Sequence, residues 1–342
     1  MLGVSVPKER AEAVRRRLAA LHLVDKTHAI VEDGDWIVIP VLAAPEHTIT
    51  DSHDGRLVDR EFSARGSFVD PIDEIRRIAE VPAELKELLP GKWERIGDVA
   101  VLRLVPELEP FESAVAMAYA SVLGLKSVLR ETGPIEGDLR RPTTKIILGS
   151  DTVTIHVENH LRYKLDVSEI MFSSGNQEER LRMAGLRCDS ETVVDMFAGI
   201  GYFSLPLAVY QRPKKVIACE LNPVAHGFLV ENTRLNNVES IIEPVLGDNR
   251  DLVGEAFADR VIMGYVKTTH EFLPTAMRLV KDGGVIHYHE TCPNDNINVR
   301  PLQRLQEAAK PGKVELLRSK AIKSYAPGVS HMVLDARVVK SS

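Results

Sequence analysis

The residues with the clearest potential for chemistry lie in the second half of the chain, in the segment Asp195-Met196-Phe197-Ala198-Gly199-Ile200-Gly201. The segment overlaps the apolar run Val193–Met196, which predicts a strand, and it precedes a helix expected to continue through Tyr210. Glycines in such a turn let the backbone approach a ligand closely. Asp195 ends the strand, where its carboxylate is expected to order the loop and to face a cationic amino-acid moiety. The segment therefore predicts a loop that holds a small molecule.

Two further polar positions follow the next two predicted strands. Glu220 ends the strand Val216–Cys219 and is placed to accept both hydroxyls of a ribose. Asp248-Asn249 follows the strand Ile241–Leu246, where a carboxylate and an amide are suited to read an adenine edge. Ligands of open α/β sheets bind at the carboxyl ends of the strands. These positions, together with the glycine loop, therefore predict one nucleoside site.

Two nucleoside cofactors compete for such a site. An NAD-binding loop would carry a third glycine at position 204, where this chain has Ser204. An Asp before the glycines and Phe197-Ala198 within the loop fit a sulfonium nucleoside better. The residues favour S-adenosylmethionine as the cofactor, and methyltransferase-type chemistry over hydride transfer.

Short apolar strands alternate with helices from about residue 191 to residue 342, a pattern typical of a parallel sheet covered on both faces. We therefore predict an α/β fold in which residues 191–342 form a Rossmann-like domain of the S-adenosylmethionine-dependent methyltransferase type. The later expected elements are strands at Arg260–Met263, Val285–Tyr288, near Val314 and at Met332–Val338, and helices near Glu271–Lys281 and Leu302–Ala309.

The first part of the chain predicts two smaller α+β parts. Residues 1–45 are expected to form an N-terminal module with a helix at Pro7–Leu21 between two strands. Residues 46–70 are polar and rich in turn-forming residues, which predicts a linker. Residues 71–190 mix strands and helices without strict alternation, which favours an α+β middle domain. Its expected elements are strands at Val99–Leu104, Lys145–Leu148 and Thr152–Val157, and helices near Asp73–Ala79 and Glu112–Leu123.

Composition restricts the class of protein. The net charge of −6 excludes a basic nucleic-acid binder overall but leaves room for a local basic face. The three cysteines, Cys188, Cys219 and Cys292, form no CxxC pair, which argues against disulfides and a zinc site. No apolar run approaches the roughly 18 residues that span a bilayer. The N-terminus lacks a signal pattern, so we expect a cytoplasmic protein. We also expect a monomer that holds no metal ion.

Three runs of sequence carry a family resemblance: VVDMFAGIGYFSLPLAVY, YKLDVSEIMFSSGNQEERLRM and DRVIMGYVKTTHEFLPTAMRLVKDGGVIHYHETCP. Together they resemble the tRNA wybutosine-synthesis enzymes that transfer the 3-amino-3-carboxypropyl group of S-adenosylmethionine. A sister family, the tRNA guanine-37 N1-methyltransferases, shares the fold and much of the first two runs. The resemblance covers most of the chain, including the N-terminal module.

Two departures separate the chain from the sister family. Those methyltransferases carry an Asn-x-Pro-type motif after the fourth strand, where this chain has Gly264-Tyr265-Val266. They also tend to carry Pro-Arg after a Phe-Ser pair, where this chain continues from Phe172-Ser173 into Ser174-Gly175-Asn176. Both departures favour the aminocarboxypropyl branch, as does Tyr-His-Glu at 288–290.

The resemblance implies a reaction and an acceptor. Transfer to carbon 7 of 4-demethylwyosine at position 37 of phenylalanine tRNA is expected, with release of 5′-methylthioadenosine. By resemblance Ser173 and Arg180 contact the cofactor, and Arg180 is suited to pair with the methionyl carboxylate or to orient Glu220. The expected cofactor contacts are Ser173, Arg180, Asp195, Phe197, Ala198, Gly199, Gly201, Glu220, Asp248, Asn249, Gly264 and Tyr265.

Other assignments stay open in the sequence. The catalytic proton acceptor is unknown; His287, His289 and Glu290 are conceivable, although structural histidines are the better expectation. Tyr265 is a candidate for stacking on the acceptor base, and Tyr325–Gly328 is either a lid turn or a connector. The rival functions are guanosine-37 N1-methylation and a non-catalytic tRNA-binding module. The basic groups considered for tRNA are Arg15-Arg16-Arg17, Arg140-Arg141 with Lys145, and Lys214-Lys215.

Overall fold

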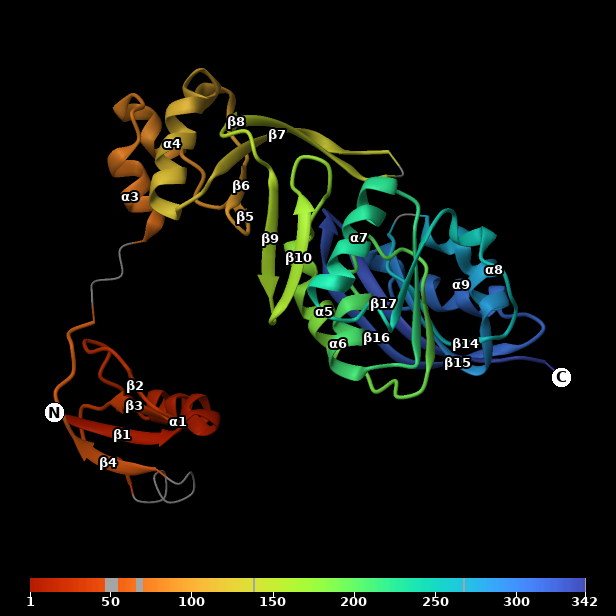
Figure 1. Ribbon diagram of the computed structural model, residues 1–342, viewed down its shortest axis with the longest axis horizontal. Coiled ribbons are helices and arrows are strands. Elements are labelled where there is room, and N and C mark those ends of the chain that lie inside the picture. The colour runs from red at the N-terminus through yellow and green to blue at the C-terminus, as the bar shows by residue number, and fades with distance from the viewer. Residues whose placement is uncertain (47–54, 66–69, 138, 267, 342) are drawn as a thin grey trace. The chain divides into compact units, whose positions relative to one another are not determined.

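The computed structural model describes residues 1–46, 55–65, 70–137, 139–266 and 268–341 (Figure 1). The chain forms two compact units, residues 1–70 and residues 71–342.

In its described residues, the N-terminal unit is a four-stranded antiparallel sheet with one helix. The sheet order is β2-β3-β1-β4. Its elements are β1 (Leu2–Pro7), α1 (Lys8–Ala20), β2 (Val31–Asp33), β3 (Trp36–Pro40) and β4 (Arg56–Asp59). Val14 and Leu18 of α1 pack on Val4, Val6 and Ile39 of the sheet to make a separate core.

Strand β4 corrects the linker predicted at residues 46–70. Arg56–Asp59 pairs antiparallel with β1, and Phe62 is also buried, so this part of the segment belongs to the N-terminal unit. The polar composition misled the prediction because β4 is an edge strand. Of its four residues only Val58 is partly buried, and the other three are exposed. Residues 47–54 and 66–69 of the predicted linker lie outside the described residues.

Residues 71–148 form a small sheet covered by two helices. The sheet order is β5-β6-β7-β8, and only β6 and β7 run parallel. Ile75 of α3 and Tyr119 of α4 pack on Ala100, Leu102 and Val128 of the strands. The elements are α3 (Pro71–Ile78), β5 (Glu94–Ile96), β6 (Val99–Leu102), α4 (Glu112–Leu123), β7 (Ser127–Glu136) and β8 (Arg141–Leu148).

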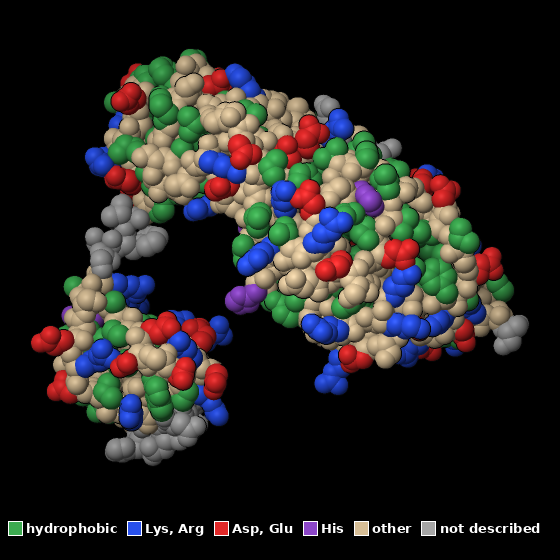
Figure 2. Space-filling model, in the orientation of Figure 1, with side chains coloured by type: hydrophobic (Ala, Val, Ile, Leu, Met, Phe, Trp, Pro, Cys, Tyr) green, Lys and Arg blue, Asp and Glu red, His purple; other side chains and the backbone are tan. Residues whose placement is uncertain are grey.

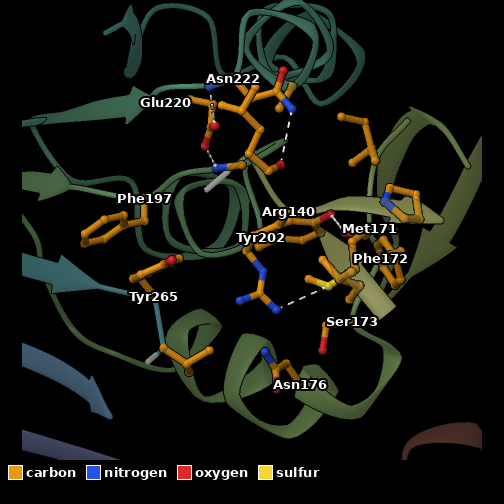
Figure 3. A pocket seen from close by; sticks show the side chains of 18 of the residues that line it. Arg140, Met171, Phe172, Ser173, Asn176, Phe197, Tyr202, Glu220, Asn222 and Tyr265 are labelled. Carbon is orange, nitrogen blue, oxygen red and sulfur yellow. Dashed lines mark hydrogen bonds between the residues drawn. The ribbon is translucent and has the colours of Figure 1, made fainter. Parts of the chain in front are cut away.

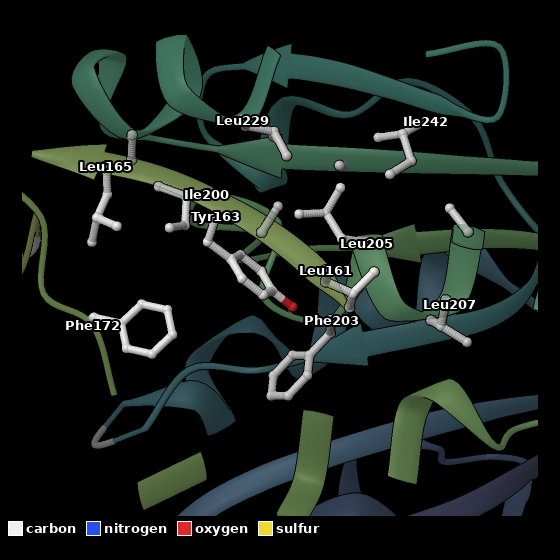
Figure 4. Packing of buried hydrophobic residues seen from close by; sticks show 14 of the residues in the cluster. Leu161, Tyr163, Leu165, Phe172, Ile200, Phe203, Leu205, Leu207, Leu229 and Ile242 are labelled. Atoms are coloured by element: carbon white, nitrogen blue, oxygen red, sulfur yellow. The ribbon is translucent and has the colours of Figure 1, made fainter. Parts of the chain in front are cut away.

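The hairpin of β9 (Val153–Glu158) and β10 (Leu161–Asp166) joins the core of the following domain. Leu161, Tyr163 and Leu165 share one buried cluster with Leu205 and Leu229 (Figure 4). The boundary predicted at residue 190 is therefore wrong as a core boundary. Alternation of apolar residues located the strand β9, but the sequence does not show which sheet its hairpin packs against.

The C-terminal part is a seven-stranded sheet with the order β13-β12-β11-β14-β15-β17-β16. Strands β11 to β15 are parallel, which confirms the predicted Rossmann-like α/β fold. The sheet departs from the predicted parallel arrangement at its end, where β17 is antiparallel to both β15 and β16. The strands are β11 (Thr192–Asp195), β12 (Lys215–Glu220), β13 (Ile242–Leu246), β14 (Ala258–Met263), β15 (Val280–Pro293), β16 (Lys313–Ala326) and β17 (Val329–Val339).

Helices cover both faces of this sheet (Figure 1). Val193 packs in the cluster that contains residues of α6 and α7, and Val194 packs in the other, with residues of α8 and α9. Successive strand residues point to opposite faces, so both faces are buried. Asn222 caps α7 by accepting from Val224 N at 2.9 Å. The helices are α5 (Gln177–Ala184), α6 (Ser204–Gln211), α7 (Pro223–Leu235), α8 (Leu273–Leu279) and α9 (Arg300–Ala308).

Candidate active site

A cavity of about 900 Å³ opens at the carboxyl ends of the parallel strands (Figure 3). Its walls come from the loops after β11, β12, β13 and β14, from the segment before α5, from β7 and β8, and from β16 and β17. The expected cofactor contacts that line it are Ser173, Arg180, Phe197, Gly199, Glu220, Asp248, Asn249, Gly264 and Tyr265. Asp195, Ala198 and Gly201 are not among the lining residues.

Asp195 lies beneath the glycine loop and is fully buried. Its Oδ2 accepts from Ser204 Oγ at 2.7 Å and its Oδ1 from Phe197 N at 3.3 Å. Burial raises the pKa of Asp195 to about 6, against the effect of these hydrogen bonds. The carboxylate therefore orders the loop, as predicted, but it does not face the cavity. Ser204, which argued against NAD, is its partner.

The loop glycines shape the path of the backbone. Gly199 has a φ of +58° and its N–H donates to Glu220 Oε2 at 2.7 Å. Gly201 has a φ of +102°, and a Cβ there would lie 2.7 Å from Leu205 Cγ. Ala198 is buried and its N–H donates to Cys219 O. Ala198 and Gly201 thus hold the loop against the sheet, while Gly199 lies at the cavity wall.

Glu220 presents its carboxylate to the cavity from the end of β12. Each oxygen accepts one backbone N–H at 2.7 Å, Oε2 from Gly199 and Oε1 from Asn222. Burial raises the pKa of Glu220, and the amide hydrogen bonds oppose this effect. A carboxylate has about four acceptor positions, so each oxygen retains one for a ribose hydroxyl.

The polar pair after β13 is placed to meet a base. Asp248 Oδ1 accepts from Arg250 N and Nε, both at 2.9 Å. Asn249 Nδ2 donates to Met196 O at 2.9 Å. Asn249 Oδ1 is buried and has no hydrogen-bond partner among the described residues. A buried acceptor without a partner is costly, so this oxygen fits the exocyclic amine of an adenine.

Aromatic side chains make one wall of the cavity. Phe197 and Tyr265 stack with centroids 5.1 Å apart and an interplanar angle of 19°, and Phe272 meets Phe197 edge-on at 5.0 Å. Gly264 lies so close to Phe203 that a Cβ would be 2.5 Å from its Cε2. Figure 3 shows Phe197 and Tyr265 on the same side of the cavity. These flat surfaces and the acceptors of Glu220 and Asn249 together fit an adenine nucleoside.

Arg180 differs from both of its predicted roles. Its Nε and Nη2 donate to the two oxygens of Glu158 at 2.8 and 2.6 Å, and its Nη1 donates to Ser173 O at 2.8 Å. The side chain is 2% exposed. Because the guanidinium is engaged by Glu158, it neither orients Glu220 nor remains available as the main partner of a ligand carboxylate.

Several cavity residues gave no signal in the sequence. Lys323 of β16 donates to Ser173 Oγ at 3.2 Å, and His331 of β17 lies opposite Lys323 in the strand pair. Tyr202 donates to Met171 O at 2.6 Å, and Asn176 lines the cavity beside Ser173. The lysine and the histidine reach the site from about 150 residues beyond Ser173, and no local motif marks them.

The conceivable proton acceptors are not part of the cavity wall. His287 Nδ1 is 2.5 Å from Asp335 Oδ1, and Glu290 accepts from Tyr288 OH at 2.7 Å. His289 is buried, with its Nδ1 3.1 Å from His331 Nε2. None of the three is a lining residue, in agreement with the structural expectation for the histidines. His331 does line the cavity, and burial lowers its pKa to about 4.

The predicted basic groups are mostly engaged in ion pairs. Arg15 and Arg16 both donate to Glu12, Lys145 pairs with Glu112, and Lys215 pairs with Glu243. On the face drawn in Figure 2, basic and acidic side chains are interspersed. Arg140 differs from the rest, because it lines the cavity with its guanidinium 6.0 Å from the Tyr265 ring.

The three cysteines are free and buried. No group of three potential metal ligands occurs in the described part of the chain. No described helix is long and apolar enough to cross a membrane. Tyr325 and Ala326 are the last two residues of β16, and the turn at Pro327-Gly328 connects it to β17. Tyr325 also lines the cavity.

The strand order, the glycine loop and the acidic residues at strand ends define a protein of the S-adenosylmethionine-dependent methyltransferase fold class. Family models match three successive regions: the tRNA methyltransferase 5 N-terminal domain at residues 3–49, the TYW2 N-terminal domain at 75–152, and the TRM5/TYW2 methyltransferase domain at 154–317. The chain belongs to the TRM5/TYW2 family.

Relatives within the family are named for two activities, aminocarboxypropyl transfer and methyl transfer. The tRNA(Phe) (4-demethylwyosine(37)-C(7)) aminocarboxypropyltransferase of Pyrococcus horikoshii is 53% identical over 77% of this chain and 94% of its own length. The enzyme of the same name from Methanocaldococcus jannaschii is 45% identical over 72% of this chain and 97% of its own length. The tRNA (guanine(37)-N(1))-methyltransferase Trm5b of Pyrococcus abyssi is 37% identical over 98% and 99%.

Solved structures repeat this division. The structure of Pyrococcus horikoshii TYW2 in complex with MeSAdo is 51% identical, covers 79% of this chain and 100% of its own, and has a TM-score of 0.72. The structure of Trm5b from Pyrococcus abyssi is 35% identical, covers 99% of both chains, and has a TM-score of 0.69.

Proposed function

We propose that this protein transfers the 3-amino-3-carboxypropyl group of S-adenosylmethionine to carbon 7 of 4-demethylwyosine at position 37 of phenylalanine tRNA. The observation that carries the proposal is the identity of 53% to an aminocarboxypropyltransferase matched over 94% of its length. The cavity supports it with acceptors for ribose and adenine at Glu220 and Asn249. Gly264-Tyr265-Val266, in place of an Asn-x-Pro-type motif, adds support.

When bound, the sulfonium of S-adenosylmethionine activates the carbons attached to it, so geometry decides which group leaves. Aminocarboxypropyl transfer forms a bond from carbon 7 to the methionyl γ-carbon and breaks the bond from that carbon to sulfur. Sulfur keeps the electron pair, 5′-methylthioadenosine leaves, and carbon 7 loses its proton. The chain's task is therefore chiefly to hold the γ-carbon about 3–3.5 Å from the acceptor.

Particular residues are suited to this placement. Glu220 holds the ribose and Asn249 the base, which fixes the nucleoside half of the cofactor. Tyr265, which stacks on Phe197, offers its ring to an extruded base. Arg140, beside Tyr265, is placed to pair with a tRNA phosphate next to the base that accepts the transferred group.

The leaving nucleoside tests the proposal. We expect incubation of the protein with S-adenosylmethionine and tRNA containing 4-demethylwyosine to produce 5′-methylthioadenosine, measured by chromatography. Production of S-adenosylhomocysteine would instead support methyl transfer, for example to N1 of guanosine 37. Methyl transfer is the second candidate because Trm5b matches 98% of this chain. A chain that binds tRNA and yields neither nucleoside would be a non-catalytic binding module.

A further inference from the structure

Lys323 is a cation of the cavity without an acidic partner among the residues that the structure describes. Its Nζ donates to Ser173 Oγ at 3.2 Å, and its side chain is partly buried. Burial, helped by the positive charge of Arg180, lowers the pKa of Lys323. A buried cation is costly unless an anion balances it. The position therefore calls for a negatively charged ligand.

The other cations of the cavity wall are committed elsewhere, with one exception. Arg180 is held by Glu158, Arg103 by Glu131 at 2.8 Å, and Arg250 by Asp248 at 2.9 Å. The exception is Arg140, whose Nη2 lies 3.5 Å from Met171 Sδ and whose guanidinium faces the Tyr265 ring. Lys323 is thus the available cation beside Ser173.

We propose that Lys323 binds the carboxylate of the aminocarboxypropyl chain of S-adenosylmethionine and so decides which carbon on sulfur faces the acceptor. This inference rests on the proposed function. Ser173, to which Lys323 donates, lines the same cavity as Glu220 and Asn249. Arg180, the sequence-based candidate for the same carboxylate, has its charge balanced by Glu158 and also donates to Ser173 O.

The cavity is arranged for a ligand with a nucleoside at one end and a charged chain at the other. In Figure 3, Glu220 and Asn222 lie at one side of the cavity and Ser173 and Asn176 at the opposite side. A ribose held by Glu220 leaves the amino-acid chain free to extend toward Ser173. A carboxylate anchored there fixes the γ-carbon, which is the reacting atom of aminocarboxypropyl transfer.

The backbone gives Lys323 its direction and its space. The pairing of β16 with β17 shifts register between Ala321 and Lys323, and again between Ser324 and Ala326. Such bulges re-aim side chains near functional sites. On the facing segment, a Cβ at Gly175 would lie only 3.0 Å from Lys323 Nζ. The absence of a side chain at Gly175 therefore leaves room for the ammonium group.

Calorimetry with three ligands separates the carboxylate from the nucleoside. The ligands are S-adenosylmethionine and S-adenosylhomocysteine, which carry the carboxylate, and 5′-methylthioadenosine, which does not. For Lys323→Met in the full chain, we expect the Kd of the first two to rise about 10- to 100-fold, the range for lost hydrogen bonds to charged groups. The Kd of 5′-methylthioadenosine should stay unchanged, and Lys323→Arg should recover part of the loss.

Lys320→Met is the matched control, because Lys320 lies on the same strand, pairs with Glu178 and does not line the cavity. It should leave all three dissociation constants unchanged. An equal loss for all three ligands in Lys323→Met, or no loss for any, overturns the proposal. A loss of tRNA affinity with unchanged S-adenosylmethionine affinity also overturns it and assigns Lys323 to a phosphate. A wild-type chain that binds none of the ligands contradicts the proposed function itself, and this inference with it.

Discussion

Asp195 is a fully buried carboxylate and Glu220 a partly buried one, and their surroundings give them different tasks. Glu220 accepts one backbone N–H on each oxygen and keeps acceptor capacity that faces the cavity. The two oxygens of Asp195 accept hydrogen bonds from Ser204 Oγ and Phe197 N beneath the loop. At the scale of the residue, the first carboxylate is suited to bind a ligand and the second to hold the loop in shape.

Replacing Glu220 by Ala is expected to weaken S-adenosylmethionine binding by about 1–3 kcal/mol, because charged hydrogen bonds to the ribose are lost. Isothermal calorimetry measures the change. Glu243→Ala is the control, since Glu243 is an exposed partner of Lys215 on the neighbouring strand. Unchanged affinity in Glu220→Ala would mean that the ribose binds elsewhere.

Replacing Asp195 by Asn is expected to change how stability depends on pH. The folded pKa of Asp195, about 6, exceeds the ordinary value of 3.8. Between these values the folded state binds the proton more tightly, so the wild-type carboxyl stabilises at low pH and loses this contribution as pH rises through about 6.

Urea unfolding at pH 4.5 and pH 7 tests this sign. Between pH 4.5 and pH 7, the free energy of unfolding of the wild type should fall relative to that of Asp195→Asn by roughly 1–3 kcal/mol. Identical pH dependence in the two chains would show that the pKa of Asp195 is not raised.

Among the elements, α7, β10 and the glycine loop are joined by one buried side chain. Asn232 Oδ1 accepts from Lys164 N at 2.7 Å, and its Nδ2 donates to Lys164 O and Ile200 O, both at 3.1 Å. Asn232 is fully buried. One turn further along, Asn236 makes the same pair of bonds to Arg162 at a more exposed position.

These two asparagines form a matched pair of tests. We expect Asn232→Ala to lower the free energy of unfolding by roughly 2–4 kcal/mol, because buried amide and carbonyl groups lose their partners. Asn236→Ala, where water replaces the lost bonds, should cost about 1 kcal/mol or less. Chemical denaturation measures both, and equal losses would contradict the role given to burial.

The elements also show what sequence patterns can and cannot predict. Alternation of apolar strands with helices predicted the Rossmann-like domain, because both faces of its parallel sheet are buried. It missed the direction of β17, since periodicity carries no information about strand polarity. It missed β4 and placed the core boundary at residue 190, because an edge strand is polar and the packing partner of a hairpin is not local.

The site follows the same division. The residues at strand ends, Glu220 and Asp248-Asn249, were predictable because the fold brings the ends of parallel strands together. Lys323 and His331 were not, because they enter from β16 and β17 through long-range pairing. The partner of Arg180 was not predictable either, since Glu158 lies on a hairpin 22 residues earlier in the chain.

On the scale of the whole molecule, the chain combines two compact units, and its relatives match different shares of its length. Residues 1–70 have their own core. The aminocarboxypropyltransferases of Pyrococcus horikoshii and Methanocaldococcus jannaschii are matched over nearly their whole lengths by 77% and 72% of this chain. Trm5b, in contrast, matches 98% of it. We propose that the N-terminal unit contributes to tRNA binding and not to the cofactor site.

A chain of residues 71–342 is expected to bind S-adenosylmethionine as the full chain does, because every lining residue of the cavity lies within it. Its affinity for tRNA should fall, since a tethered second contact is lost. Calorimetry for the cofactor and gel-shift titration for tRNA provide the two readouts. Weaker cofactor binding, or unchanged tRNA affinity, would contradict this division of tasks.

The identity of the transferred group is the central claim, and double labelling measures it most directly. The protein is incubated with tRNA containing 4-demethylwyosine and with S-adenosylmethionine that carries one isotope in the methyl group and another in the carboxypropyl carbons. We predict that the carboxypropyl label alone enters the tRNA, at the modified base of position 37. Entry of the methyl label alone would contradict the account and identify the protein as a methyltransferase.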